Sequence, residues 1–178
     1  MNLPNKLTML RVCMVPVFVV LMLADGIPYG NILAGVIFIL ASLTDTLDGY
    51  IARRDNLITD FGKFMDPIAD KLLVCSAMIC LVEQEKLAAW MVIIIIGREL
   101  AIGGFRLVAV EKGTVIAASY WGKFKTVSQM IMVIMLIFDF GSVWNMIAQV
   151  VTWIAVILTV ISLVDYLKTN WSVMDGQM

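Results

Sequence analysis

Apolar runs of membrane-spanning length recur along the whole chain, and the polar segments between them are short. Because about 20 consecutive apolar residues cross a bilayer as a helix, this pattern predicts an all-α integral membrane protein. The hydrophobic fraction of 61% supports the same class, since ordinary soluble domains contain roughly 45 to 50% apolar residues. No polar stretch is long enough to form a soluble domain. Residues 1–178 are therefore interpreted as one membrane domain.

The polar interruptions predict a bundle of six transmembrane helices that follows a short N-terminal interfacial helix. Leu3, Leu7 and Leu10 recur at helical spacing with polar residues between them, which predicts an interfacial helix over residues 1–11. The six spans are expected at residues 12–24, 31–53, 61–82, 88–110, 118–138 and 143–167. Residues 169–178 are expected to form a short tail.

The distribution of positive charge predicts the orientation of these spans. With six spans the termini lie on one side, and all of the 13 lysines and arginines except Lys86 then lie in, or nearer to, segments on that side. Cytoplasmic segments carry an excess of lysine and arginine. We therefore expect a multi-pass protein of a cell membrane with both termini on the cytoplasmic side.

Four aspartates interrupt the apolar background in two pairs. Asp45 and Asp48 are three residues apart in one expected helix, and Asp66 and Asp70 are four apart in the next. Each spacing places both carboxylates of a pair on one helical face. A charged side chain near the middle of a span costs roughly 2.5 to 3.5 kcal/mol on insertion scales. Four such residues therefore indicate a functional site.

The positions of the pairs predict which carboxylates face each other. Residues at equal depth in an antiparallel hairpin have a constant sum of residue numbers. The sum for Asp45 with Asp70 nearly equals the sum for Asp48 with Asp66. We therefore expect Asp45 to face Asp70 and Asp48 to face Asp66, around a turn near Leu57. The chain contains no histidine, and carboxylate ligands alone suit Mg²⁺ or Mn²⁺. Four carboxylates can hold one such ion or two. The competing interpretation is a set of salt bridges to nearby lysines and arginines.

The aspartates belong to a longer motif with fixed spacings: Asp45-x-x-Asp48-Gly49-x-x-Ala52-Arg53, eight residues, then Gly62-x-x-x-Asp66-x-x-x-Asp70. This motif resembles the signature of the CDP-alcohol phosphatidyltransferase family at all eight positions. Other segments extend the resemblance over nearly the whole chain: Pro4-Asn5-x-Leu7-Thr8-x-x-Arg11, Gly97-Arg98-Glu99, Phe105-Arg106 and Gly122-Lys123-x-Lys125-Thr126. Together they are most similar to bacterial members that use sn-glycerol 3-phosphate as acceptor.

The resemblance implies a reaction in which the phosphatidyl group of CDP-diacylglycerol passes to sn-glycerol 3-phosphate, giving phosphatidylglycerol phosphate and CMP. It implies that Asp45, Asp48 and Asp66 ligate metal with Asp70 nearby, and that Asp70 is the base that deprotonates the attacking hydroxyl. It also implies a homodimer. The residues expected to line the cytidine diphosphate site are Asp48, Gly49, Ala52, Arg53 and Gly62. The small residues among them also suit close helix packing, and Arg53 also suits an interfacial anchor.

An acceptor that bears a phosphate requires cations, and the fourth and fifth expected helices supply them. Arg98 lies far inside its span, which favours a phosphate or carboxylate partner over interfacial anchoring. The same matching of depth by residue number, here called depth matching, predicts that Arg106 lies opposite Lys123 around a turn near residues 113 and 114. The alternative for both is a topology charge, and Lys125 is interpreted in that way. By resemblance alone, Thr8 and Arg11 join the acceptor site.

Two other functions compete with this interpretation. The same family includes enzymes with other acceptors, such as inositol phosphate, serine or phosphatidylglycerol. A divalent-cation transporter would also place carboxylates inside the membrane. The sequence shows no clear inverted repeat and no matching acidic pair in its second half, which argues against a transporter.

Overall fold

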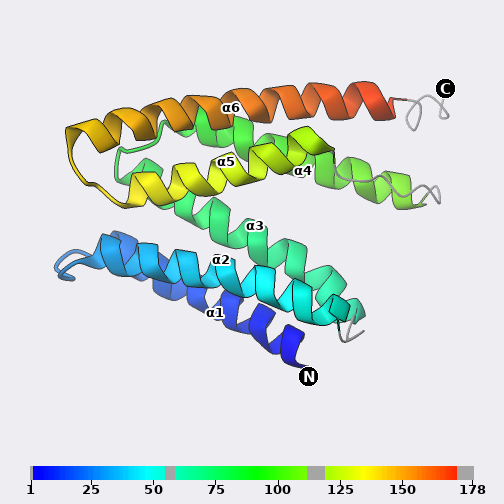
Figure 1. Ribbon diagram of the computed structural model, residues 1–178, viewed down its shortest axis with the longest axis horizontal. Helices are drawn as coiled ribbons and strands as arrows, with labels where there is room; N and C mark the ends of the chain where they lie inside the picture. The colour runs from blue at the N-terminus through cyan, green and yellow to red at the C-terminus, as the bar shows by residue number, and fades with distance from the viewer. Residues whose placement is uncertain (1, 55–58, 112–118, 172–178) are drawn as a thin grey trace. The chain divides into compact units, whose positions relative to one another are not determined.

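The computed structural model describes residues 2–54, 59–111 and 119–171; within these ranges the side chains of residues 46, 48–50, 52, 53, 60, 63 and 111 are not described. The described residues form six helices and no strand (Figure 1), which confirms the all-α class. The helices are α1 Leu3–Leu23, α2 Gly30–Arg54, α3 Asp60–Glu83, α4 Ala89–Glu111, α5 Tyr120–Ile137 and α6 Ser142–Asn170.

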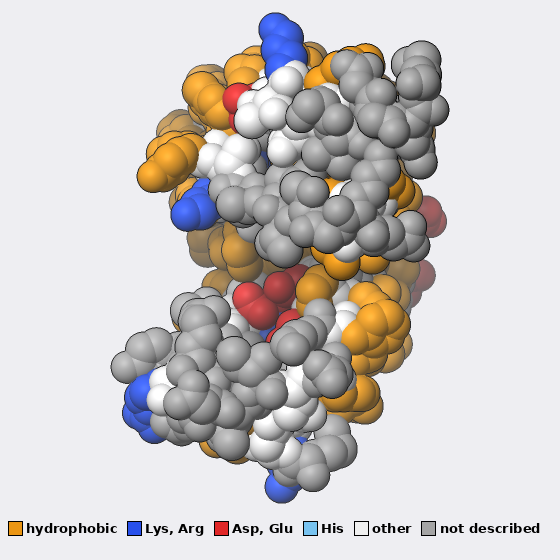
Figure 2. Space-filling model, turned by 90° about the vertical axis from the view of Figure 1, so that its right-hand side faces the viewer, with side chains coloured by type: hydrophobic (Ala, Val, Ile, Leu, Met, Phe, Trp, Pro, Cys, Tyr) orange, Lys and Arg blue, Asp and Glu red, His pale blue; other side chains and the backbone are white. Residues whose placement is uncertain are grey.

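Two of the described helices, α1 and α6, are long and apolar enough to cross a membrane, which suggests a membrane protein. Charged residues lower the apolar character of α2 to α5. Every described helix nevertheless exposes large hydrophobic side chains, and Figure 2 shows hydrophobic side chains toward the left and right margins of the view. Contiguous apolar surface of this kind is typical of contact with lipid or another protein. The six transmembrane spans stay a prediction.

The N-terminal helix α1 is continuous from Leu3 to Leu23. The Asn2 side chain caps it by accepting a hydrogen bond from the Asn5 amide at 3.1 Å, and Pro4 lies in its first turn. Proline is tolerated there because the first amides of a helix have no intrahelical acceptor. The predicted interfacial helix over residues 1–11 and the span over residues 12–24 thus belong to one continuous helix, and their places relative to a membrane stay predictions.

The polar face of α1 is turned inward against protein, the reverse of an interfacial helix, which turns its polar face to water. Leu3 and Leu10 are exposed (54% and 50%), whereas Asn5, Thr8 and Arg11 are buried. Carboxylates on neighbouring helices account for this inversion, because buried polar groups require hydrogen-bonding partners. The polar stripe of α1 thus faces protein and its leucines face outward.

The described residues form two compact units, residues 1–87 with 133–139 and residues 88–132 with 140–178. In the first unit, α1 packs against both α2 and α3, while α2 and α3 contact each other little. The described parts of the two aspartate-bearing helices are therefore joined mainly through α1. At Gly35 a Cβ atom would lie 2.8 Å from Phe138 Cε2, so only glycine fits beside that ring.

In the second unit α4 packs against α6. Trp90 of α4 and Trp153 of α6 contact each other with ring centroids 5.8 Å apart. Phe105 of α4 meets Tyr166 of α6 edge to face at 5.6 Å. These aromatic pairs, whose geometries are favourable beyond simple area burial, join the two helices at separate points along their length.

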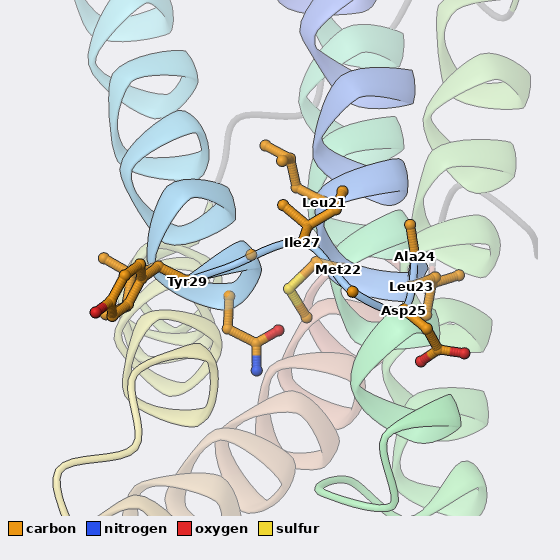
Figure 3. A pocket seen from close by; sticks show the side chains of 11 residues that line it. Leu21, Met22, Leu23, Ala24, Asp25, Ile27 and Tyr29 are labelled. Carbon is orange, nitrogen blue, oxygen red and sulfur yellow. The ribbon is translucent and has the colours of Figure 1, made fainter.

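A hollow of about 400 Å³ lies at the turn between α1 and α2 (Figure 3). Gly26 and Tyr29 have positive φ angles of 84° and 58° in this turn. From α3, Gln84 Nε2 donates to the Met22 carbonyl at 2.6 Å and to Asn31 Oδ1 at 3.0 Å, which ties α3 to the turn. The hollow is at the C-terminal end of α1, where Asp25 lines it, and is separate from Asp45, Asp66 and Asp70.

Candidate active site

The aspartates of α2 and α3 converge on a buried arginine of α1. Arg11 Nη1 lies 3.0 Å from Asp45 Oδ1 and 2.7 Å from Asp70 Oδ1, and Arg11 Nε donates to the Ala41 carbonyl at 3.2 Å. The arginine side chain is fully buried, whereas those of Asp45 and Asp70 are 38% and 44% exposed. Depth matching predicted that these two aspartates face each other, and in the structure both carboxylates form ion pairs with Arg11 Nη1.

A second carboxylate of α3 is held by the same helix. Thr8 Oγ1 lies 2.6 Å from Asp66 Oδ1 and 3.2 Å from the Pro4 carbonyl. One turn earlier, Thr59 donates to Asn5 Oδ1 at 2.9 Å and accepts a hydrogen bond from the Gly62 amide at 3.1 Å, which caps α3. Two residues one turn apart in α1 therefore bind the N-cap of α3 and, about two turns further on, Asp66.

The guanidinium group of Arg11 binds Asp45 and Asp70 through the same nitrogen atom. Among the side chains that the structure describes, no three acidic residues or cysteines lie close enough to hold one metal ion. Asp48, the fourth expected ligand, lies outside those side chains.

The second unit contains a buried polar network between α4, α5 and α6. Glu99 forms ion pairs with Arg98, at 2.8 Å, and with Lys125, and Arg98 Nε donates to Ser162 Oγ at 3.1 Å. Lys125 is only 2% exposed. Next to it on α5, Gln129 Nε2 lies 3.4 Å from Thr159 Oγ1. A carboxylate and a serine hydroxyl thus bind Arg98.

The other two predicted acceptor cations are exposed. The guanidinium of Arg106 lies 5.7 Å from the centroid of the Tyr166 ring, and Lys123 Nζ lies 5.4 Å from that of Tyr120. The turn used for depth matching is outside the described ranges, so the pairing of Arg106 with Lys123 stays a prediction. The guanidinium found beside Gly122 is that of Arg98, whose Nη2 would lie 3.5 Å from a Cβ atom there.

Comparison with known proteins identifies the family of this arrangement. The sequence profile of the family described as CDP-alcohol phosphatidyltransferase matches residues 1–161. The chain belongs to the CDP-alcohol phosphatidyltransferase family. It is 45% identical over 184 residues to the CDP-diacylglycerol–glycerol-3-phosphate 3-phosphatidyltransferase of Bacillus subtilis (strain 168), an alignment that covers 96% of this chain and 95% of that protein.

Other relatives also match along nearly their whole length or most of it. The chain is 37% identical to the Haemophilus influenzae protein of the same name, with 94% of this chain and 92% of that protein covered. It is 40% identical to a probable phosphatidylglycerophosphate synthase of Mycobacterium tuberculosis, with 93% and 79% covered. These findings confirm the family that the aspartate motif predicted.

As a CDP-alcohol phosphatidyltransferase, the chain shows part of its signature in the described structure. The backbone of α2 includes Asp48, Gly49, Ala52 and Arg53, but these four side chains lie outside the described residues. Gly62 is buried, and a Cβ atom there would lie 3.3 Å from both Asn5 Oδ1 and Thr59 Oγ1. Close packing against α1 therefore accounts for glycine at this position.

Sequence reasoning missed the burial of Lys125, which it interpreted as a topology charge. A signal was present, because Gln129 follows Lys125 by four residues in an apolar segment and so lies on the same helical face. Two polar residues on one face of an otherwise apolar helix indicate a protein-facing stripe. The structure also assigns Thr8 and Arg11 contacts with aspartates, which the resemblance had not implied.

Proposed function

We propose that this enzyme transfers the phosphatidyl group of CDP-diacylglycerol to sn-glycerol 3-phosphate and releases CMP. The observation that carries the proposal is the nearly full-length similarity, at 45% identity, to a relative named for this reaction. The convergence of Asp45 and Asp70 supports it, because displacement at phosphorus requires charged groups gathered where the transition state develops charge.

The proposed reaction depends on Mg²⁺ or Mn²⁺ held by Asp45, Asp48, Asp66 and Asp70. The donor set fits such a cation, because Asp45 and Asp70 already converge on a positive group and are partly exposed. Carboxylate oxygens are the ligands that these cations prefer. One or two bound ions would neutralise the pyrophosphate and make CMP a better leaving group.

Asp70 is proposed as the base. Its carboxylate accepts the proton of the acceptor hydroxyl as the new oxygen–phosphorus bond forms at the β-phosphorus, and the bond from that phosphorus to the CMP oxygen breaks. Gly49, Ala52, Arg53 and Gly62 are proposed, with Asp48, to line the cytidine diphosphate site. Arg98, Arg106 and Lys123 are proposed to bind the acceptor phosphate.

The proposed setting is the bacterial cell membrane. Six spans, cytoplasmic termini and a site that opens to the cytoplasmic side would give a lipid donor and a water-soluble acceptor access to the same carboxylates. Positive charge favours this orientation. A homodimer is proposed from the family resemblance.

A release assay tests the reaction. Purified protein in detergent, with CDP-diacylglycerol and Mn²⁺ or Mg²⁺, is expected to release CMP when sn-glycerol 3-phosphate is added, and much less with serine, inositol phosphate or phosphatidylglycerol. Chelation of the divalent cation should stop the release, because the carboxylates alone leave the pyrophosphate charge uncompensated. Absence of CMP release with every acceptor, together with cation uptake into liposomes, would instead establish a transporter.

The acceptor role of Arg106 predicts a selective kinetic defect. Arg106→Ala is expected to raise KM for glycerol 3-phosphate by roughly 10- to 150-fold, since hydrogen bonds to charged groups contribute about 1.5 to 3 kcal/mol, and to change KM for CDP-diacylglycerol much less. Steady-state CMP release with each substrate varied in turn measures both constants. Lys168→Ala, an exposed cation of α6, is the control. An equal rise in both constants would contradict the assignment.

A further inference from the structure

Three polar residues of α1 lie one helical turn apart, and each contacts a polar group of α3. Asn5 binds Thr59, Thr8 binds Asp66 and Arg11 binds Asp70. All three α1 side chains are buried. The sequence numbers increase together on both sides, so α1 and α3 run in the same direction, with contacts three residues apart on α1 and seven and then four residues apart on the α3 side. This row of contacts is called the α1 ladder below.

We propose that Thr8 and Arg11 of the α1 ladder are positioning residues that hold Asp66, Asp45 and Asp70 in the orientation that binds the divalent cation. The inference rests on the proposed metal site. It assigns to α1 the part of an outer coordination shell, in which groups that do not touch the metal fix the rotamers of the ligands that do.

The contacts favour this role over binding of the acceptor phosphate. A threonine hydroxyl has a single proton, and the 2.6 Å separation between Thr8 Oγ1 and Asp66 Oδ1 is that of a charge-assisted hydrogen bond. Arg11 is fully buried and uses Nη1 and Nε within the protein. A phosphate would therefore displace carboxylates from both residues, at the cost of leaving those carboxylates without these partners.

The same contacts leave ligation chemically possible. Each one is made to the Oδ1 atom of its aspartate, and a carboxylate can ligate a cation through either oxygen. Hydrogen bonds and ion pairs to one oxygen restrict rotation of the carboxylate, so less conformational entropy is lost when the cation binds. Removal of such an outer-shell partner typically lowers metal affinity by about 10- to 100-fold.

Mn²⁺ binding to purified protein in detergent, without substrate, tests the inference by electron paramagnetic resonance. Thr8→Val removes the hydroxyl and keeps the shape, and is expected to weaken Mn²⁺ binding about 10-fold or more. Thr8→Ser keeps the hydroxyl and should restore most of the affinity. Thr152→Val is the matched control, since Thr152 is a buried helical threonine whose hydroxyl donates to the Ala148 carbonyl at 2.8 Å; its Mn²⁺ affinity should equal that of the wild type.

Arg11→Lys provides an independent variant, which also serves if Thr8→Val does not fold. It keeps the positive charge but loses the planar fork that reaches two carboxylates and a carbonyl, so Mn²⁺ binding should again weaken.

Unchanged Mn²⁺ affinity in Thr8→Val and Arg11→Lys, with a raised KM for glycerol 3-phosphate, would overturn the inference in favour of an acceptor contact. Equal losses in Thr8→Val and Thr8→Ser would show a packing role and also overturn it. If the wild type bound no Mn²⁺, the proposed metal site would fall and the inference with it.

Discussion

Asp70→Asn is expected to lower the turnover number for CMP release by roughly 10²- to 10⁴-fold, the usual contribution of a general base. Asparagine has nearly the shape of aspartate and its Oδ1 atom can still accept a hydrogen bond from Arg11 Nη1. The variant should therefore fold and bind CDP-diacylglycerol. What it loses is the ability to take the proton from the acceptor hydroxyl.

The measurement pairs turnover with binding of CDP-diacylglycerol by the same preparation. Asp25→Asn is the control, because Asp25 is exposed in the turn after α1, at the opposite end of that helix from Arg11. Its turnover should equal that of the wild type. Near-normal turnover in Asp70→Asn would exclude Asp70 as the base, whereas loss of lipid binding would assign it to the binding of the donor.

Glu99→Gln is expected to destabilise the second unit by about 3 kcal/mol, the low end of the cost of removing one partner from a buried ion pair, because the Glu99 side chain is 21% exposed. Glu99 binds both Arg98 and Lys125, and Lys125 is buried. Glutamine keeps the size of the side chain but loses the charge that compensates two cations. The loss should appear as a lower thermal unfolding temperature in detergent.

Lys125→Met should be less harmful, because Glu99 then keeps its ion pair with Arg98 at 2.8 Å and the methionine fills the space with apolar atoms. Glu83→Gln, at the exposed end of α3, is the control and should unfold at the wild-type temperature. Equal destabilisation in Glu99→Gln and Lys125→Met would mean that Glu99 does not compensate Arg98.

Much of the architecture follows from local sequence. Apolar runs separated by turn residues predicted the helices because a helix in an apolar setting satisfies its own backbone hydrogen bonds. The spacing of Asp45, Asp66 and Asp70, with the flanking glycines, identified the family, since a motif with fixed spacing is a local property of the chain. Expected and observed ends of α3 differ by one residue at each end.

The partners of the charged residues could not be predicted in the same way. Asn5, Thr8 and Arg11 alternate with leucines, a pattern that an interfacial helix and a protein-facing helix share. Which face is buried depends on carboxylates more than 50 residues away along the chain, Asp66 and Asp70. The burial of Lys125 could not be predicted for the same reason, since its partner Glu99 lies on another helix.

The sequence by itself determined the helical class and the family, and it predicted a site at the four aspartates, because these depend on composition and on spacings within one or two helices. Only the tertiary structure decided that α1 lies against both aspartate-bearing helices and that Arg11 joins Asp45 to Asp70. The physical reason is that a buried charge takes the partner that packing brings within reach, and packing depends on contacts between segments distant in sequence.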